Sequence, residues 1–178
     1  MRNLFFLSML LSTASASSFA EVLDAESNGF RVRATVSIAA PREQVYSAAV
    51  QQVGDWWSDD HTVSGDASNM SIDARPLGCF CETLGDGAGL SHMMVTFVNP
   101  LVMIRFTGGL GPLGLMGVEG NMTWEFEEAG DGTIVVLNYA VGGYLAGGLD
   151  AVAPAVDGVL GEQMTRLKDF VESQAAND

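Results

Sequence analysis

Positive charge is scarce in this sequence. Its 178 residues include eight lysines and arginines against 22 aspartates and glutamates, which gives a formal net charge of −14. An acidic surface without a basic patch repels nucleic acid and anionic lipid, so we expect neither as a partner. The hydrophobic share of 48% excludes a disordered acidic chain, because it supplies enough apolar surface for a core.

Long apolar runs are also missing. The longest, residues 4–11, is too short to cross a bilayer, so we expect no membrane span. It follows Arg2 and precedes small residues, with candidate cleavage sites after Ala16 and Ala20. This arrangement is typical of a secretory signal peptide, and the alternative is an uncleaved buried helix. We predict a signal peptide over residues 1–20 and one domain over residues 21–178, periplasmic or secreted.

Cysteine and histidine are limited to two residues each. The cysteines form Cys79-Phe80-Cys81, and residues two apart in a strand share a face at a spacing that suits a disulfide poorly. A bulge would be needed to close that bond, so the pattern predicts two buried thiols facing the core. With His61 and His92 the cysteines make four potential zinc ligands, but their spacing is not that of a common zinc motif. We therefore predict no metal and no cofactor.

The segment after the cysteines predicts a hairpin with two possible registers. Symmetric pairing about Gly87 would place Glu82 opposite His92 as a cross-strand charge pair. A slip of one residue would place Cys81 there instead and permit a cysteine–histidine nucleophile pair. In either register His92 would lie on the face opposite the apolar side chains of its strand, which are Met93, Val95 and Phe97.

The remaining pattern predicts an α+β domain. Apolar and polar residues alternate over residues 30–38, which indicates a half-buried strand, and Pro41 opens a short helix. Short strands follow up to about residue 141. The final segment, about residues 150–175, carries apolar residues at helical spacing: Leu149, Val152, Val156, Leu160, Met164, Leu167 and Val171. Gly158 and Gly161 within it would either thin the helix over a cavity or permit close backbone packing.

Two further motifs leave alternatives open. The glycine-rich residues 108–117 lack the lysine of a phosphate loop, and they indicate either a mobile lid or a loop whose leucines plug the core. Trp56 and Trp57 follow the first helix and would either form a ligand mouth or anchor that helix to the sheet. No G-x-S-x-G motif supports a serine hydrolase.

The chain resembles a known superfamily over about residues 29–172. The resemblance rests on three segments. They are residues 38–46, Ile-Ala-Ala-Pro-Arg-Glu-Gln-Val-Tyr, then Gly132-Thr133 at the start of a predicted strand, and Arg166-Leu167-Lys168 near the end of the last helix. These segments are similar to those of the START-related SRPBCC superfamily, which includes pollen-allergen-like and polyketide cyclase/dehydratase-like proteins. The resemblance implies a helix-grip fold, with a curved seven-stranded antiparallel sheet, two short helices and a long C-terminal helix closing an apolar cavity.

Within that fold we expect a ligand to contact residues from the first helix, the sheet and the last helix. The expected set is Trp56, Trp57, His61, Cys79, Cys81, Met93, Phe97, Trp124, Tyr139, Val156, Leu160 and Met164.

Three functions are open at this point. The leading hypothesis is an exported binding protein for a small hydrophobic molecule, such as a lipid, polyketide or other aromatic compound. The second is a cyclase- or hydrolase-like enzyme that uses His61, Glu82 or a cysteine as acid or base. The third is a protein-interaction domain, including a homodimer, that uses the outer face of the sheet at Ile134, Val136 and Ala140.

Overall fold

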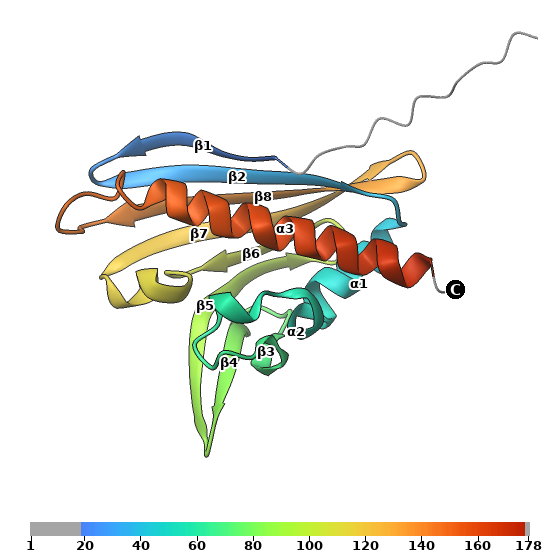
Figure 1. Ribbon diagram of the computed structural model, residues 1–178, viewed down its shortest axis with the longest axis horizontal. Coiled ribbons are helices and arrows are strands. Elements are labelled where there is room, and N and C mark those ends of the chain that lie inside the picture. Colours follow the sequence, from blue (N-terminus) through green and yellow to red (C-terminus); the bar gives the residue numbers. More distant parts are fainter. Residues whose placement is uncertain (1–18, 177–178) are drawn as a thin grey trace, which may run out of the picture.

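Eight antiparallel strands form one curved sheet along which the C-terminal helix lies (Figure 1). The computed structural model describes residues 19–176, so most of the predicted signal peptide lies outside the described residues. The strand order is β1-β2-β8-β7-β6-β5-β4-β3. The strands are β1 Phe19–Glu26, β2 Gly29–Ile38, β3 Met70–Ile72, β4 Cys79–Gly85, β5 Ala88–Asn99, β6 Met103–Thr107, β7 Val118–Ala129 and β8 Gly132–Gly143.

The helix-grip architecture is confirmed, with one strand more than the seven expected. The extra strand is β1, which begins inside the segment predicted as signal peptide and pairs with β2. On its other side β2 pairs with β8, from Gly29 opposite Gly142 to Ile38 opposite Thr133. The alternation seen in residues 30–38 sets which side chains of β2 enter the core, because buried and exposed positions alternate along it.

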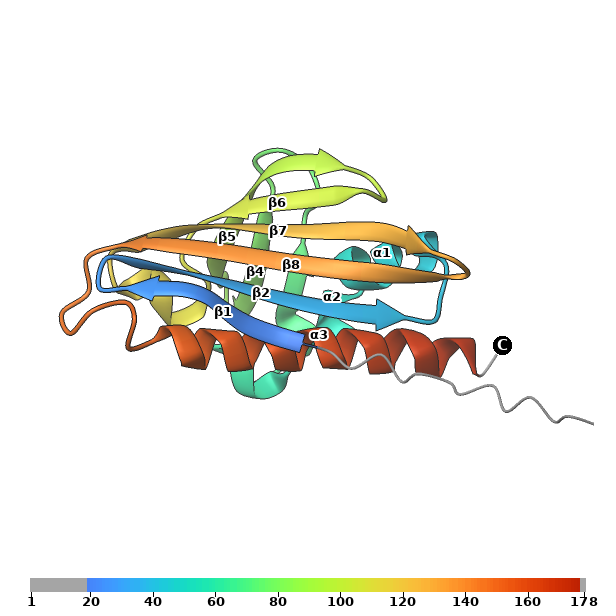
Figure 2. The ribbon, with the colours of Figure 1, turned by 90° about the horizontal axis from the view of Figure 1, so that it is seen from above.

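The C-terminal helix α3, Ala153–Ala175, begins three residues later than predicted, with Pro154 in its first turn. It packs closely against β1 and β2 and runs alongside them (Figure 2). A Cβ atom at Gly161 would lie 2.8 Å from the Cβ of Ala20 in β1, whereas one at Gly158 would meet nothing. Gly161 therefore serves close packing between helix and sheet edge, and Gly158 faces open space.

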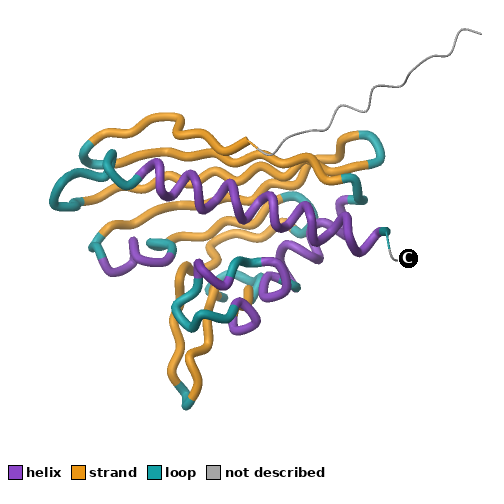
Figure 3. The backbone as a smooth tube through the Cα atoms, viewed as in Figure 1, coloured by secondary structure: helices purple, strands orange, loops and turns teal. Residues whose placement is uncertain are grey.

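Short helical segments cover the other half of the sheet. Helices α1, Arg42–Gln51, and α2, Val53–Trp56, are followed by the 3-10 turns η1, Asp59–His61, and η2, Ala67–Asn69. Figure 3 shows these segments gathered between α3 and strands β3 to β5, and α2 contacts both α3 and β3. A third 3-10 turn, η3, Gly111–Leu115, lies in the glycine-rich loop before β7.

Two bulges in β5 correct the predicted register. Phe80 pairs with Met93, as the slipped register predicts, but Cys81 pairs with Ser91, so His92 is an extra residue without either predicted cross-strand partner. His92 is buried beside Met93, so its predicted position on the opposite face is wrong. A second irregularity at Thr96 reverses the alternation further along the strand. The predicted inward orientation of Phe97 is therefore wrong.

The outward side chain of Phe97 is 42% exposed. Its ring lies 5.9 Å from the guanidinium carbon of Arg105 on the neighbouring strand. This is a surface cation–π contact and takes Phe97 away from the interior.

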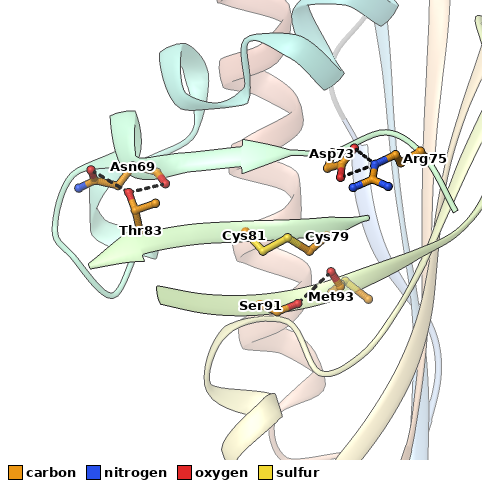
Figure 4. Close-up of a disulfide and its surroundings, with 8 residues drawn as sticks. All are labelled: Asn69, Asp73, Arg75, Cys79, Cys81, Thr83, Ser91 and Met93. Atoms are coloured by element: carbon orange, nitrogen blue, oxygen red, sulfur yellow. Dashed lines mark hydrogen bonds and ion pairs between the residues drawn. A yellow bond between two sulfur atoms is a disulfide. The ribbon is translucent and has the colours of Figure 1, made fainter. Parts of the chain in front are cut away.

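The prediction of two buried free thiols is also wrong. Cys79 and Cys81 form a disulfide, with Cα atoms 5.3 Å apart (Figure 4). The bulge that the sequence argument required lies directly opposite them, in β5. The inner face of β4 is occupied by the buried side chains of Phe80 and Glu82, so the half-buried cysteines lie on the outer face.

Candidate binding site

An aromatic cluster fills the interior where α2, α3 and the sheet meet. Phe80 lies at its centre and contacts Trp57 at 5.3 Å, His92 at 5.8 Å, Phe106 at 6.1 Å and Trp124 at 6.2 Å between ring centroids. Trp56 joins the cluster through contacts with Trp57 and Trp124. All these side chains are buried. The cluster is a closely packed apolar part of the core, in which ring edges meet ring faces.

The three indole N–H groups are satisfied within the protein. Trp56 donates to the carbonyl of Ala48 at 3.0 Å, and Trp57 donates to the carbonyl of His61 at 3.1 Å. Trp124 donates to the sulfur of Met122. Trp56 joins α2 to α1 through its hydrogen bond, and its ring, 6.1 Å from that of Trp124 in β7, anchors the helical segment to the sheet as the second alternative predicted.

The loop of residues 58–66, called the clamped loop below, is held on one side by α3. The Gln163 side-chain oxygen, fully buried, accepts a hydrogen bond of 2.9 Å from the backbone N–H of Ser58. Arg166 donates to the carbonyl of Trp56 at 2.8 Å. On the surface, His61 lies 3.2 Å from Glu162, so His61 faces the outside of α3.

Glu82 holds the same loop from the sheet side. Its carboxylate accepts hydrogen bonds from the backbone N–H groups of Val63, at 3.0 Å, and Ser64, at 2.5 Å. The Nε2 atom of His92 lies 2.9 Å from the same carboxylate, and both side chains are buried. The predicted Glu82–His92 contact is thus present, although the bulge at His92 creates it and direct cross-strand pairing does not.

The carboxylate of Glu82 is strongly stabilised in its ionised form. Burial acts to raise its pKa, but the hydrogen bonds from Ser64, Val63 and His92 outweigh burial and lower the pKa to about 2. Glu82 is therefore charged at neutral pH. It fixes His92 with Nε2 as the donor, which leaves Nδ1 for another partner.

Among residues 19–176, two buried polar atoms beside the clamped loop have no hydrogen-bond partner. They are Nδ1 of His92 and Nε2 of Gln163. Buried polar groups are normally paired, because an unpaired one costs about 1–3 kcal/mol. Both residues use their other polar atom to hold this part of the chain. The ring of His92 contacts Phe80 of the aromatic cluster, and Gln163 binds the backbone N–H of Ser58, which follows Trp57 in the chain.

The opposite end of the interior is closed by residues 108–117, the glycine-rich loop. The Tyr139 hydroxyl donates to the carbonyl of Gly108 and accepts from the N–H of Leu110, both at 3.0 Å. Burial raises the pKa of Tyr139 to about 12, so it keeps its proton. Leu113 is 5% exposed and plugs the core, whereas Leu115 is 91% exposed. Leu113 thus plugs the core as one alternative predicted, and Leu115 does not.

The expected ligand-contacting residues divide into three groups. Buried in the interior are Trp56, Trp57, Met93, Trp124, Tyr139, Leu160 and Met164. Val156 is half-buried, and His61 lies at the surface. Cys79, Cys81 and Phe97 lie on the outer face of the sheet.

Three residues of the candidate site were not expected from the sequence: Phe80, Phe106 and Gln163. Gln163 shares a helix face with Leu160 and Leu167, and this spacing could have identified it as buried. Phe80 was misplaced together with the cysteines, because the inward face of β4 was assigned to the wrong set of alternate residues.

An open hollow on the other face of the sheet has a different character. It measures about 430 Å³ and is lined by residues of β1, β2, β7 and β8. Acidic side chains, among them Glu26 and Glu119, and the Asp24–Arg31 ion pair surround it. Its charge and openness do not suit an apolar ligand.

Two further findings concern residues 19–176. Within this range no three His, Cys, Asp or Glu side chains gather closely enough to hold a metal ion. No helix in it has both the length and the apolar character needed to cross a membrane.

Comparison with known proteins agrees with this architecture. Residues 29–172 match the family described as polyketide cyclase/dehydrase and lipid transport. A solved structure from Rhizobium leguminosarum is 21% identical, with a TM-score of 0.61 over 88% of this chain and 98% of that one. A Rhodobacter sphaeroides structure is 17% identical, with a TM-score of 0.56 over 88% and 99%.

A third structure is DynU16, from the dynemicin biosynthetic locus. It is 18% identical, with a TM-score of 0.57, and the match covers 81% of this chain but only 48% of DynU16. At such identities the structural matches show a common fold. No curated protein matches the sequence.

Proposed function

The chain belongs to the polyketide cyclase/dehydrase and lipid transport family, as the resemblance of residues 38–46 predicted, and on that premise we propose that it binds a small hydrophobic molecule between the sheet and α3. The observation that carries the proposal is the aromatic cluster around Phe80, bordered by two unpartnered polar atoms. The rings contact one another, so a ligand that enters would exchange ring–ring contacts for contacts with itself.

The unpartnered atoms define the chemistry of the ligand further. Nε2 of Gln163 can donate to a carbonyl, ether or hydroxyl oxygen, and Nδ1 of a neutral His92 can accept from a hydroxyl. An apolar, flat body with at least one oxygen substituent fits both. Phenols and hydroxylated polycyclic ketones meet this requirement better than a plain hydrocarbon.

A melting experiment with paired compounds tests the binding. We expect oxygenated aromatic compounds to raise the Tm of the wild-type protein more than hydrocarbons of the same shape, because binding to the folded state stabilises it by mass action. The Gln163→Leu variant should lose this preference and still bind hydrocarbons. Glu162→Gln, on the exposed side of the same helix turn, is the control. The proposal fails if no fatty acid, sterol or aromatic compound raises the wild-type Tm.

An acid–base enzyme is the second candidate, because the Glu82–His92 pair leaves Nδ1 of His92 as a potential proton acceptor. Its reaction would be proton transfer from an acidic O–H or C–H of the bound molecule. His92→Gln should then abolish turnover of a bound compound while its binding persists, as followed by mass spectrometry of the product. Unchanged turnover in this variant would leave only the binding function.

We also propose export, with the leader inside the predicted residues 1–20; cleavage after Ala16 would leave Phe19 and Ala20 of β1 in the mature chain, whereas cleavage after Ala20 would remove them. N-terminal sequencing of the protein from its own host should find the leader removed and the protein outside the cytoplasm. An intact Met1 in cytoplasmic protein would contradict this.

A further inference from the structure

The Cys79–Cys81 disulfide closes a very small ring. The two residues are separated by two positions, and their Cα atoms lie 5.3 Å apart. A disulfide stabilises a fold mainly by restricting the unfolded chain, and this effect grows with the length of the loop that it closes. A ring that contains only one intervening residue, Phe80, removes little conformational entropy from the unfolded chain. Global stability therefore does not explain the bond.

The closed bond also holds β4 out of its ordinary strand geometry. In a regular strand, residues two positions apart are separated by about 6.6–6.8 Å, because each residue advances the strand by about 3.3–3.4 Å. The 5.3 Å between Cys79 and Cys81 is shorter, and the bulge at His92 lies opposite. Opening the disulfide would allow β4 to return to its ordinary spacing.

The sulfur atoms lie on the accessible face of the sheet. Both cysteines are half-buried, and their side chains are on the face opposite the core (Figure 4). The pairing partners of Cys81 are Ser71 and Ser91, and both are small and exposed. Met94, opposite Cys79, is also exposed. An external thiolate can therefore approach from the solvent side, as disulfide exchange requires.

From these observations we propose that Cys79 and Cys81 form a thiol–disulfide exchange centre whose co-reactants are external dithiols and disulfides. In the reductive direction, an external thiolate attacks one cysteine sulfur. A mixed disulfide forms and the other cysteine leaves as a thiolate, which then takes up a proton. The second thiolate of the same external dithiol attacks the mixed disulfide and releases the remaining cysteine. The protein gains two electrons and two protons, and the external dithiol becomes a disulfide.

Phe80 provides an internal reporter for this exchange. It lies between the two cysteines in sequence, and its ring meets Trp57 nearly perpendicularly, with centroids 5.3 Å apart. A change in the spacing of β4 would displace that ring. Reduction should therefore alter tryptophan fluorescence while the secondary structure persists.

The experiment is reduction of the folded, oxidised full chain by dithiothreitol, followed by alkylation and mass spectrometry. We expect two thiols to appear in folded protein, at a rate within about tenfold of that of a disulfide-closed Cys-Phe-Cys peptide. Glutathione disulfide should restore the bond and the original fluorescence. The double variant Cys79→Ser/Cys81→Ser is the control, and its fluorescence should not respond to dithiothreitol.

Two outcomes would overturn the proposal. The first is a disulfide that opens more than about tenfold slower than the peptide, or only in denaturant, because external thiols then do not reach the bond in the folded protein. The second is loss of the circular dichroism of the wild-type protein when the bond opens, which would assign a structural role. The second measurement uses wild-type protein, so it is decisive even if the double variant does not fold.

Discussion

The two loops that close the interior are held in different ways. The clamped loop, residues 58–66, is fixed by the buried polar side chains of Glu82 and Gln163. The glycine-rich loop, residues 108–117, is fixed by the Tyr139 hydroxyl and by the buried side chain of Leu113. The clamped loop is therefore held by a charged group and buried hydrogen bonds, and the glycine-rich loop by one neutral hydroxyl and one apolar side chain.

Because of this difference, we expect one loop to recognise a ligand and the other to admit it to the interior. Buried charge-assisted hydrogen bonds fix geometry and are costly to break, so the clamped loop is suited to hold the polar contacts of a ligand in place. Elements with few buried contacts open at low free energy. We therefore expect ligand entry at the glycine-rich loop and polar recognition at the clamped loop.

The largest effect should come from removing the buried carboxylate. Glu82→Ala leaves His92 and two backbone N–H groups without their acceptor, so we expect the free energy of unfolding to fall by about 3–5 kcal/mol. Urea denaturation measures this change. The matched control is Glu162→Ala, which removes the surface partner of His61 and should cost at most about 1 kcal/mol. If both substitutions lowered the free energy of unfolding equally, the buried Glu82–His92 pair would contribute no more to stability than the exposed His61–Glu162 pair.

Acid should weaken the clamped loop first. The pKa of Glu82 is about 2 in the folded protein, below the usual carboxyl range, so its contribution is fully present above that range. The contribution is lost as pH falls from about 5 to about 2, and it amounts to about 3 kcal/mol. Urea denaturation at several pH values should show this loss in wild-type protein. A Glu82→Ala variant with the same acid dependence would contradict the assignment to Glu82.

Two leucines test the apolar plug of the glycine-rich loop. Leu113→Ala removes a buried side chain and should lower the free energy of unfolding by about 2–3 kcal/mol. Leu115→Ala, two residues along, changes an exposed side chain and should alter it by less than about 0.5 kcal/mol. Thermal melts of both variants measure the contrast. If Leu115→Ala were as costly as Leu113→Ala, Leu115 would have to be buried in solution.

The smallest effect should come from Tyr139→Phe. The substitution keeps the ring and removes both hydrogen bonds to the loop, which should cost about 1 kcal/mol. The loss should be local, so hydrogen exchange at the Leu110 amide should accelerate while amides of the clamped loop keep their protection. Faster exchange in both loops would mean that they open together.

The sequence predicted the parts of the fold that depend on regular periodicity. The alternation in β2 and the helical spacing in α3 both hold in the structure, because each rests on a repeat of many residues. Strand β1 was missed because its first two residues lie in the segment predicted as signal peptide, and a register shift between Val22 and Asp24 breaks the alternation of the rest.

The irregular positions could not be predicted in the same way. One extra residue in β5 turns His92 inward, sends the expected pairing out of register and permits the Cys79–Cys81 bond. A bulge is a choice among backbone conformations of similar energy, and the surrounding packing decides it. The same limitation applies to Phe97, which a second irregularity turns outward. The contact between Glu82 and His92 was found in spite of the wrong register, because the two side chains are long enough to meet across the bulge.

The strand order has a consequence for the time course of folding. Strand β2 lies between β1 and β8, so the hairpin at the start of the domain finds its second neighbour more than ninety residues later in the chain. Non-local pairing of this kind slows folding, because the entropy of loop closure is lost before the contacts form. A chain that lacks residues 132–143 would have no partner for the second edge of β2. We therefore expect the sheet to close only after β8 has been synthesised, with formation of the β2–β8 ladder limiting the rate of refolding.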